Sequence, residues 1–127
     1  MPKIPTVVAE YIAAQPEALQ PTLHEIHTML AQAYPKAKVE LYGTAKGAIP
    51  VYKDGETWLG GFSARARGPM VYLMDQAVVA KYKAQLGSLA GSGNTACVLY
   101  KPTKALDNAA LKALFETMLA EAAAKKV

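Results

Sequence analysis

The chain has 127 residues, of which 52% are hydrophobic and 19% charged, and its formal net charge is +4. This length suits a single domain over residues 1–127, and the apolar content suffices for a core, which excludes a disordered chain. No apolar run approaches the ~20 residues that span a bilayer, and no signal peptide is visible. A single cysteine, Cys97, excludes an internal disulfide. We therefore expect a cytoplasmic domain.

The basic residues do not gather in one segment. A nucleic-acid-binding protein usually concentrates Lys and Arg on one face. The tightest basic pairs here lie in three separate parts of the chain: Arg65 with Arg67, Lys81 with Lys83, and Lys125 with Lys126. We interpret them as solvated surface charge, and we expect neither a nucleic-acid nor a membrane partner.

Two helices are predicted at the start of the chain. Helical spacing of apolar residues follows Pro5, which suits a first turn, and Pro16 ends this helix. The second helix covers about Glu17 to Tyr34 and stops before Pro35. Its apolar stripe consists of Leu23, Ile26, Leu30 and Tyr34.

The middle of the chain changes to short alternating runs, which are typical of strands. Glycine accepts a positive φ without steric cost, so Asp54-Gly55 predicts a hairpin, and Gly68-Pro69 marks the next turn. The apolar residues of these runs are Val39, Leu41, Ile49, Val51, Trp58, Phe62, Val71 and Leu73.

The last third alternates helix, strand and helix. Asp75 is placed to cap a helix that runs to about Leu86 and ends at Gly87. A loop to Asn94 and a strand from Ala96 to Tyr100 follow. Asp107 is then placed to cap a final helix with an apolar stripe at Leu111, Leu114, Phe115 and Met118. The predicted fold is α+β, with an antiparallel sheet of about five strands and about four helices in the order α-α-β-β-β-β-α-β-α.

Alternation along the strands divides the sheet residues into two sets. The apolar set should face the helices and contains Val39, Leu41, Ile49, Val51, Trp58, Phe62, Val71, Leu73, Cys97 and Leu99. The mixed set contains Glu40, Tyr42, Tyr52, Arg65, Arg67, Met70, Tyr72, Met74 and Tyr100. If the second face is open, it suits a ligand or partner, and we hypothesise self-association into a homodimer through it. The alternatives are that helices cover this face, or that a bulge scrambles the alternation.

Few residues point to catalysis or to a metal. His24 and His27 are three apart on the second helix, whereas the zincin motif needs four, and no third ligand is nearby. We interpret them as surface histidines. Cys97 lies in an apolar strand, so we expect an inert core thiol. Gly91-Ser92-Gly93 precedes a strand and lacks the lysine of a phosphate loop.

Glu40 is the one carboxylate within a predicted strand. If it is buried near Arg65 or Arg67, a structural ion pair is the default interpretation, and a ligand-binding role is the alternative. No nucleophile–base pair, metal set or cofactor loop is visible, so an enzyme ranks last among the function classes.

Several segments, in order along the chain, resemble the YdhG-like family of small domains of unknown function: Thr6–Pro16, Val39–Gly43, Gly61-Phe62, Pro69–Leu73 and Gly93–Tyr100 with Cys97. The resemblance implies an α+β fold with an antiparallel sheet. One branch of the family is described as frataxin-like intracellular iron chaperones, so it also implies iron binding and delivery. The chain departs from the family pattern at Thr44-Ala45, where proline is common, and at Asn94, Thr95 and Leu99, where a basic residue is common.

We therefore expect a non-catalytic binding domain. It would present Glu40, Tyr42, Arg65, Arg67 and Tyr72 to a small molecule or a protein partner, because arginines bind anions and tyrosines offer flat contact area. The alternative is the iron chaperone that the resemblance implies. Its test is ferrous-iron binding that substitutions at Glu10, Glu17 or Glu25 weaken.

Overall fold

The computed structural model describes residues 5–43, 48–65, 68–89, 97–104 and 106–125. Its helices are α1 (Thr6–Ala13), η1 (Glu17–Leu19), α2 (Gln20–Ala33), α3 (Gln76–Lys81), α4 (Lys83–Leu86), η2 (Gly87–Leu89) and α5 (Asn108–Lys125), where η marks a 3₁₀ helix. Its strands are β1 (Lys38–Tyr42), β2 (Ile49–Asp54), β3 (Thr57–Arg65), β4 (Gly68–Tyr72) and β5 (Cys97–Leu99).

The five strands form one sheet in the order β1-β2-β3-β4-β5, and every neighbouring pair is antiparallel. The α+β fold with a five-stranded antiparallel sheet is therefore as predicted. The hairpin turn between β2 and β3 also confirms its prediction, since Gly55 has a φ of +63°. The connection from β4 to β5 contains α3, α4 and η2.

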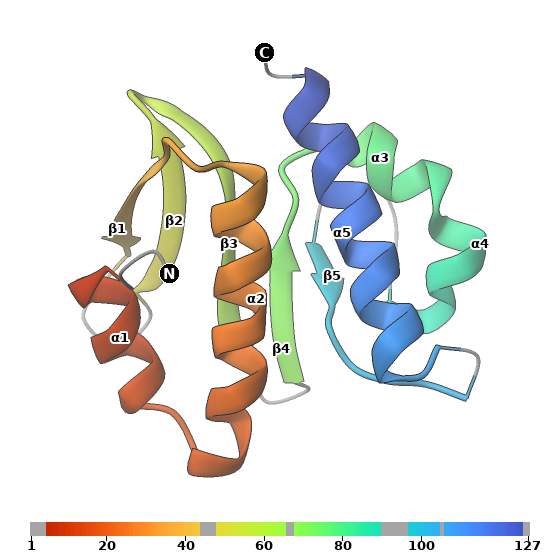
Figure 1. Ribbon diagram of the computed structural model, residues 1–127, viewed down its shortest axis with the longest axis horizontal. Helices are drawn as coiled ribbons and strands as arrows, with labels where there is room; N and C mark the ends of the chain where they lie inside the picture. Colours follow the sequence, from red (N-terminus) through yellow and green to blue (C-terminus); the bar gives the residue numbers. More distant parts are fainter. Residues whose placement is uncertain (1–4, 44–47, 66–67, 90–96, 105, 126–127) are drawn as a thin grey trace.

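The helices α1, α2 and α5 lie over one face of the sheet (Figure 1). The core fills the space between these two layers, and both predicted helical stripes are part of it. Leu23, Ile26 and Leu30 of α2 are fully buried there, as are Phe115 and Met118 of α5. No described helix lies over the opposite side of β1, β2 and β3, which we call the outer face (Figure 1). Among the described helices, none combines the length and apolar character needed to cross a membrane.

Two helices begin with the predicted caps. The Asp75 carboxylate accepts a hydrogen bond from the backbone N–H of Val78 at 3.1 Å, and that of Asp107 accepts one from Ala110 at 2.9 Å. The helix predicted from Asp75 to Leu86 is wrong in one respect, because it is divided into α3 and α4 at Tyr82. Tyr82 leaves the helical conformation, with φ −103° and ψ 10°, and its hydroxyl donates a hydrogen bond to Glu121 of α5.

The strand register corrects the predicted division of the sheet faces. Partners in register share a face, and Val39, in the helix-covered layer, pairs with Tyr52, whereas Glu40 pairs with Val51. Tyr52 is therefore in the core, at 1% exposure. Ile49 and Val51, predicted to face the helices, lie on the outer face instead.

A bulge moves Trp58 to the outer face as well. Tyr52 pairs with Gly60 and Lys53 pairs with Trp58, so Leu59 is an extra residue in β3. Trp58 and Phe62 therefore face opposite sides of the sheet, although their even spacing would place them on the same face of a regular strand. Tyr100, also predicted for the second face, packs edge-on against Phe115 of α5, with 4.7 Å between ring centroids. The prediction for Tyr100 was wrong. Tyr100 lies two residues after Val98 and therefore on the same helix-covered face, where it is 4% exposed.

Candidate functional site

A hollow of about 340 Å³ lies on the outer face, where β1, β2, β3 and the end of β4 come together. Tyr42, Trp58 and Tyr72 form its aromatic walls, and Met74 stands beside them. Ile49 and Val51, from the middle strand of this region, add aliphatic surface. Its volume is at the lower end of the range typical of small-molecule sites.

The aromatic walls of the hollow are held by specific contacts. The rings of Tyr42 and Trp58 meet edge to face, with 4.4 Å between centroids and an interplanar angle of 74°. The hydroxyl of Tyr72 lies 2.7 Å from the hydroxyl of Ser63, which is 1% exposed. The strand register creates this last contact, because Ser63 and Tyr72 occupy the same face of the β3–β4 pair. The walls are thus largely formed before any ligand arrives.

Two consecutive glycines of β3 form the floor of the hollow. A Cβ on Gly61 would lie 2.8 Å from the carbonyl oxygen of Pro50 and 3.5 Å from Cγ1 of Val51. A Cβ on Gly60 would lie 3.1 Å from Cδ2 of Leu30, on the helix-covered side. Any other residue would crowd the sheet at either position, and a side chain at Gly61 would also fill the hollow.

Met74 lines the hollow in a strained conformation. Its φ of 55° is the one positive value among the described non-glycine residues, and its side chain is 40% exposed. Left-handed backbone costs an L-residue on the order of 1 kcal/mol, and such strain is concentrated at functional sites. A strained residue and a preformed hollow therefore coincide at the same place.

Of the five predicted site residues, the structure brings Tyr42 and Tyr72 together in the hollow. Glu40 lies on the same face but is not buried, since its side chain is 55% exposed and pairs with Lys53 at 3.5 Å. The condition for a buried ion pair with an arginine, that Glu40 is buried, is therefore not met. Arg65 ends β3 opposite Gly68, with its side chain outside the described part, and Arg67 lies outside the described residues.

Sequence reasoning missed Trp58, Ile49, Val51 and the two glycines as site residues. A signal for them existed in the pair Gly60-Gly61 inside an otherwise bulky strand. Glycine within a strand often marks a bulge or a close approach of the backbone. The bulge at Leu59 is what brings Trp58 to the outer face.

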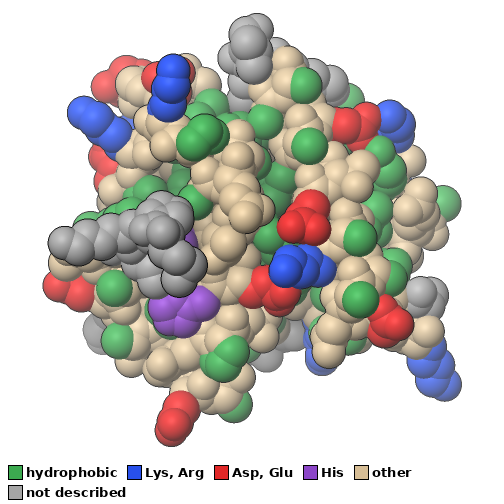
Figure 2. All heavy atoms as spheres, viewed as in Figure 1, with side chains coloured by type: hydrophobic (Ala, Val, Ile, Leu, Met, Phe, Trp, Pro, Cys, Tyr) green, Lys and Arg blue, Asp and Glu red, His purple; other side chains and the backbone are tan. Residues whose placement is uncertain are grey.

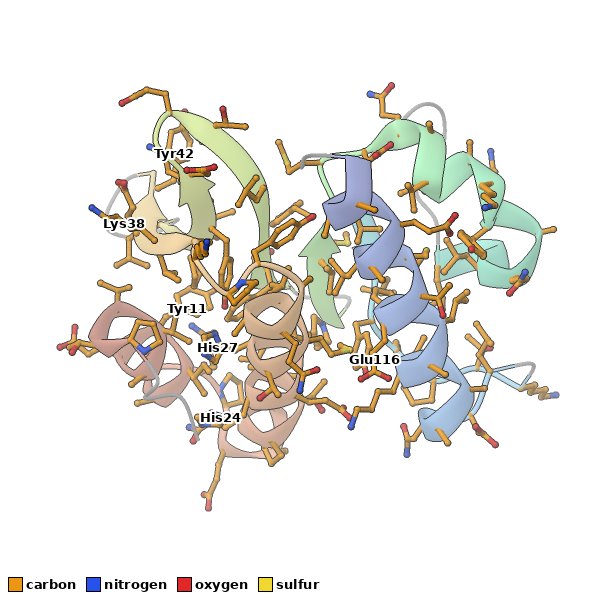
Figure 3. The ribbon with its side chains drawn as sticks, turned by 45° about the horizontal axis from the view of Figure 1, so that its top comes forward. Tyr11, His24, His27, Lys38, Tyr42 and Glu116 are labelled. Carbon is orange, nitrogen blue, oxygen red and sulfur yellow. The ribbon has the colours of Figure 1, made fainter. Side chains whose placement is uncertain are left out.

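The two histidines of α2, labelled in Figure 3, differ in burial, because His24 is exposed and His27 is buried. His27 is 6% exposed, and its Nδ1 lies 2.5 Å from the hydroxyl of Tyr52. The expectation of two surface histidines holds for His24 and is wrong for His27. Within the described ranges, no group of three or more His, Cys, Asp or Glu side chains could hold a metal ion.

Charged side chains on the helical face are mixed in sign rather than gathered into one basic patch (Figure 2). Glu25 of α2, one of the three glutamates considered for iron, pairs with Lys112 of α5 at 3.8 Å. Glu10 lies in α1 and Glu17 in η1. Cys97 is the first residue of β5, and its side chain is outside the described part, as are Gly91-Ser92-Gly93.

Comparison with known proteins identifies no relative. No protein-family model, curated protein or solved structure matches the chain. The resemblance to YdhG-like domains therefore stays a prediction, and the function has to be argued from the site itself.

Proposed function

We propose that this protein is a non-catalytic binding domain whose hollow on the outer face takes a small molecule with a flat, apolar part. The observation that carries this proposal is the preformed aromatic hollow, with Tyr42, Trp58 and Tyr72 in its walls and glycine in its floor. Flat rings pack well against aromatic walls in offset or edge-to-face geometry.

The chemistry of the lining supports binding rather than catalysis. The described residues of the hollow include no Asp, Glu, His, Lys or Cys side chain. These are the groups that most often act as general acids, general bases and nucleophiles, and the titratable side chains in the described lining are those of Tyr42 and Tyr72. A charged pair on this face, Glu40 with Lys53, lies outside the described lining.

The fluorescence of Trp58 tests this proposal directly, because it is the single tryptophan of the chain. We would titrate the protein with coumarin, which is planar and uncharged, and with camphor, a compact non-planar ketone of similar size. Coumarin should change the emission in a saturable way and bind more tightly than camphor. Equal binding of the two probes, or no saturable response to coumarin, would contradict the proposal.

Two neighbouring residues of β1 provide a matched pair of variants. Tyr42 is 56% exposed in the wall of the hollow, and Leu41 is 45% exposed on the other side of the strand. Tyr42→Ala should weaken coumarin binding about fivefold, since it removes one aromatic contact. Leu41→Ala should leave binding within about twofold. Similar losses in both variants would show that coumarin does not lie against Tyr42.

No observation in the described structure favours the iron chaperone as a second candidate. A ferrous-iron titration under anaerobic conditions, with zinc and magnesium beside it, is therefore the natural companion experiment. Saturable, iron-preferring binding would assign the protein to that alternative.

A further inference from the structure

A second and larger cavity, of about 600 Å³, lies at the end of the molecule where α2 and α5 begin. Its walls come from four parts of the chain: the entry to α2 with its first turns, the start of β4, the segment that leaves β5, and the first residue of α5. We call it the proline cleft, because Pro16, Pro69 and Pro102 each contribute to it. It shares no described lining residue with the hollow on the outer face.

The walls of the proline cleft are apolar and stiff. Proline rings fix the backbone φ, so three prolines and the side chain of Leu19 give a surface that loses little freedom when a ligand binds. Pro69 is buried and belongs to β4, which anchors this wall to the sheet.

The acidic group of the cleft is already balanced. Glu25 pairs with Lys112, with 3.8 Å between Oε1 and Nζ. Burial, together with the negative charge of Glu25, raises the pKa of Tyr100, so that its hydroxyl keeps its proton. Because Lys112 already neutralises this carboxylate, it is poorly placed to bind a cationic ligand.

The basic group at the rim, Lys101, has no such partner among the described residues. Its side chain is exposed and forms no ion pair with a described residue. A Cβ on Gly68 would lie 3.9 Å from Cδ of Lys101, which places the aliphatic stem of the lysine along the β4 side of the cleft. Thr22 and Asn108 add a hydroxyl and an amide that donate hydrogen bonds.

The geometry points to a second binding site, for a small organic acid with an apolar body. The carboxylate of this acid pairs with Lys101, and its hydrocarbon part lies against Leu19 and the prolines of the cleft. The site is separate from the proposed hollow, and neither proposal depends on the other.

Nuclear magnetic resonance titrations with four probes would test this assignment: octanoate, acetate, octylamine and octanol. Octanoate should shift the amide signals of Thr22 and Asn108 and leave the indole signal of Trp58 unchanged. It should bind at least about tenfold more tightly than acetate, which lacks the apolar body, and than octylamine, which has the opposite charge. Octanol should bind more weakly than octanoate, because it cannot form an ion pair.

Two lysines of the same segment give the matched variants. Lys101→Met should weaken octanoate binding about fivefold, whereas Lys104→Met, which removes the same charge outside the cleft lining, should leave it unchanged. Both lysines are exposed, so both variants should fold. Equal losses in the two variants, a preference for octylamine, or shifts outside the cleft would overturn the proposal, as would acetate binding as tightly as octanoate.

Discussion

The hydroxyl of Tyr52 lies 2.5 Å from Nδ1 of His27 and joins the sheet to α2 inside the core. The two rings stack at 30°, with 5.8 Å between centroids. Burial, and to a lesser degree the charge of His24, lowers the pKa of His27, while burial raises that of Tyr52. Both groups are therefore neutral at pH 7 and need no counter-ion.

This pair predicts a stability that falls with acidification. The unfolded chain takes up a proton on His27 as the pH drops through about 6.5, whereas the folded chain resists until its lowered pKa is reached. Protonation thus favours the unfolded state in that window, and above it the contribution of His27 to stability is constant. The unfolding midpoint should fall more between pH 7.5 and 5.5 in the wild type than in His27→Gln.

His24 provides the control, because it occupies the same helix and is exposed. His24→Gln should keep most of the pH dependence of the wild type. If His27→Gln and the wild type lose stability in parallel, the buried pair is not the source of the pH dependence. The midpoints can be measured by urea denaturation followed by circular dichroism.

The cap of α5 makes a separate prediction about stability. Asp107 Oδ1 accepts from the N–H of Ala110 at 2.9 Å and so satisfies one free donor at the start of an 18-residue helix. Asp107→Ala should lower the free energy of unfolding by about 1 kcal/mol, and Asp107→Asn should restore most of it, because Asn is an equally good cap. A loss of the same size in both variants would mean that the charge matters and the cap does not.

The helices and their ends could be predicted from the sequence because their signals are local. The stripe at Leu23, Ile26 and Leu30 and the caps Asp75 and Asp107 depend on residues only a few positions apart, and all of them are as expected. The order of elements follows from the same local patterns. The break at Tyr82 has no local signal, and the one contact recorded for the Tyr82 hydroxyl, with Glu121, is distant in the sequence.

The faces of the sheet could not be predicted, because they depend on pairing between strands. The alternation of side chains along a strand correctly places Val39 and Glu40 on opposite faces of β1. It does not show that Tyr52 pairs with Val39. The extra residue Leu59 then reverses the faces within β3. Tyr42 and Tyr72 were thus placed correctly on the outer face, while the third aromatic wall, Trp58, was assigned to the core.

The strain at Met74 predicts an inverted preference between glycine and alanine. Glycine is normally less stable than alanine in a folded chain, but at a φ of 55° it avoids the clash of the Cβ atom. Met74→Gly should therefore be more stable to urea than Met74→Ala, by about 1 kcal/mol. Ala113→Gly, an exposed change within α5, should show the ordinary order and lose about 1 kcal/mol. If Met74→Ala is the more stable of its pair, the backbone at Met74 is not strained.

The glycine floor links stability to ligand binding. At Gly61, a Cβ would lie 2.8 Å from the carbonyl oxygen of Pro50, so Gly61→Ala should cost about 2 kcal/mol of unfolding free energy through overpacking. Gly87, with a φ of +58° and nothing within 4 Å of a Cβ, isolates the cost of left-handed backbone alone. Gly87→Ala should cost about 1 kcal/mol.

The two alanine variants should then differ in binding. Gly61→Ala places a methyl group in the floor and should weaken coumarin binding, as followed by the emission of Trp58 under conditions where both variants remain folded. Gly87→Ala, which lies outside the lining of the hollow, should bind coumarin as the wild type does. Both variants are destabilised, so a general loss of stability would weaken coumarin binding in both. Only a ligand bound in the hollow would give the two variants different affinities. Identical affinities in the two variants would place the ligand elsewhere on the protein.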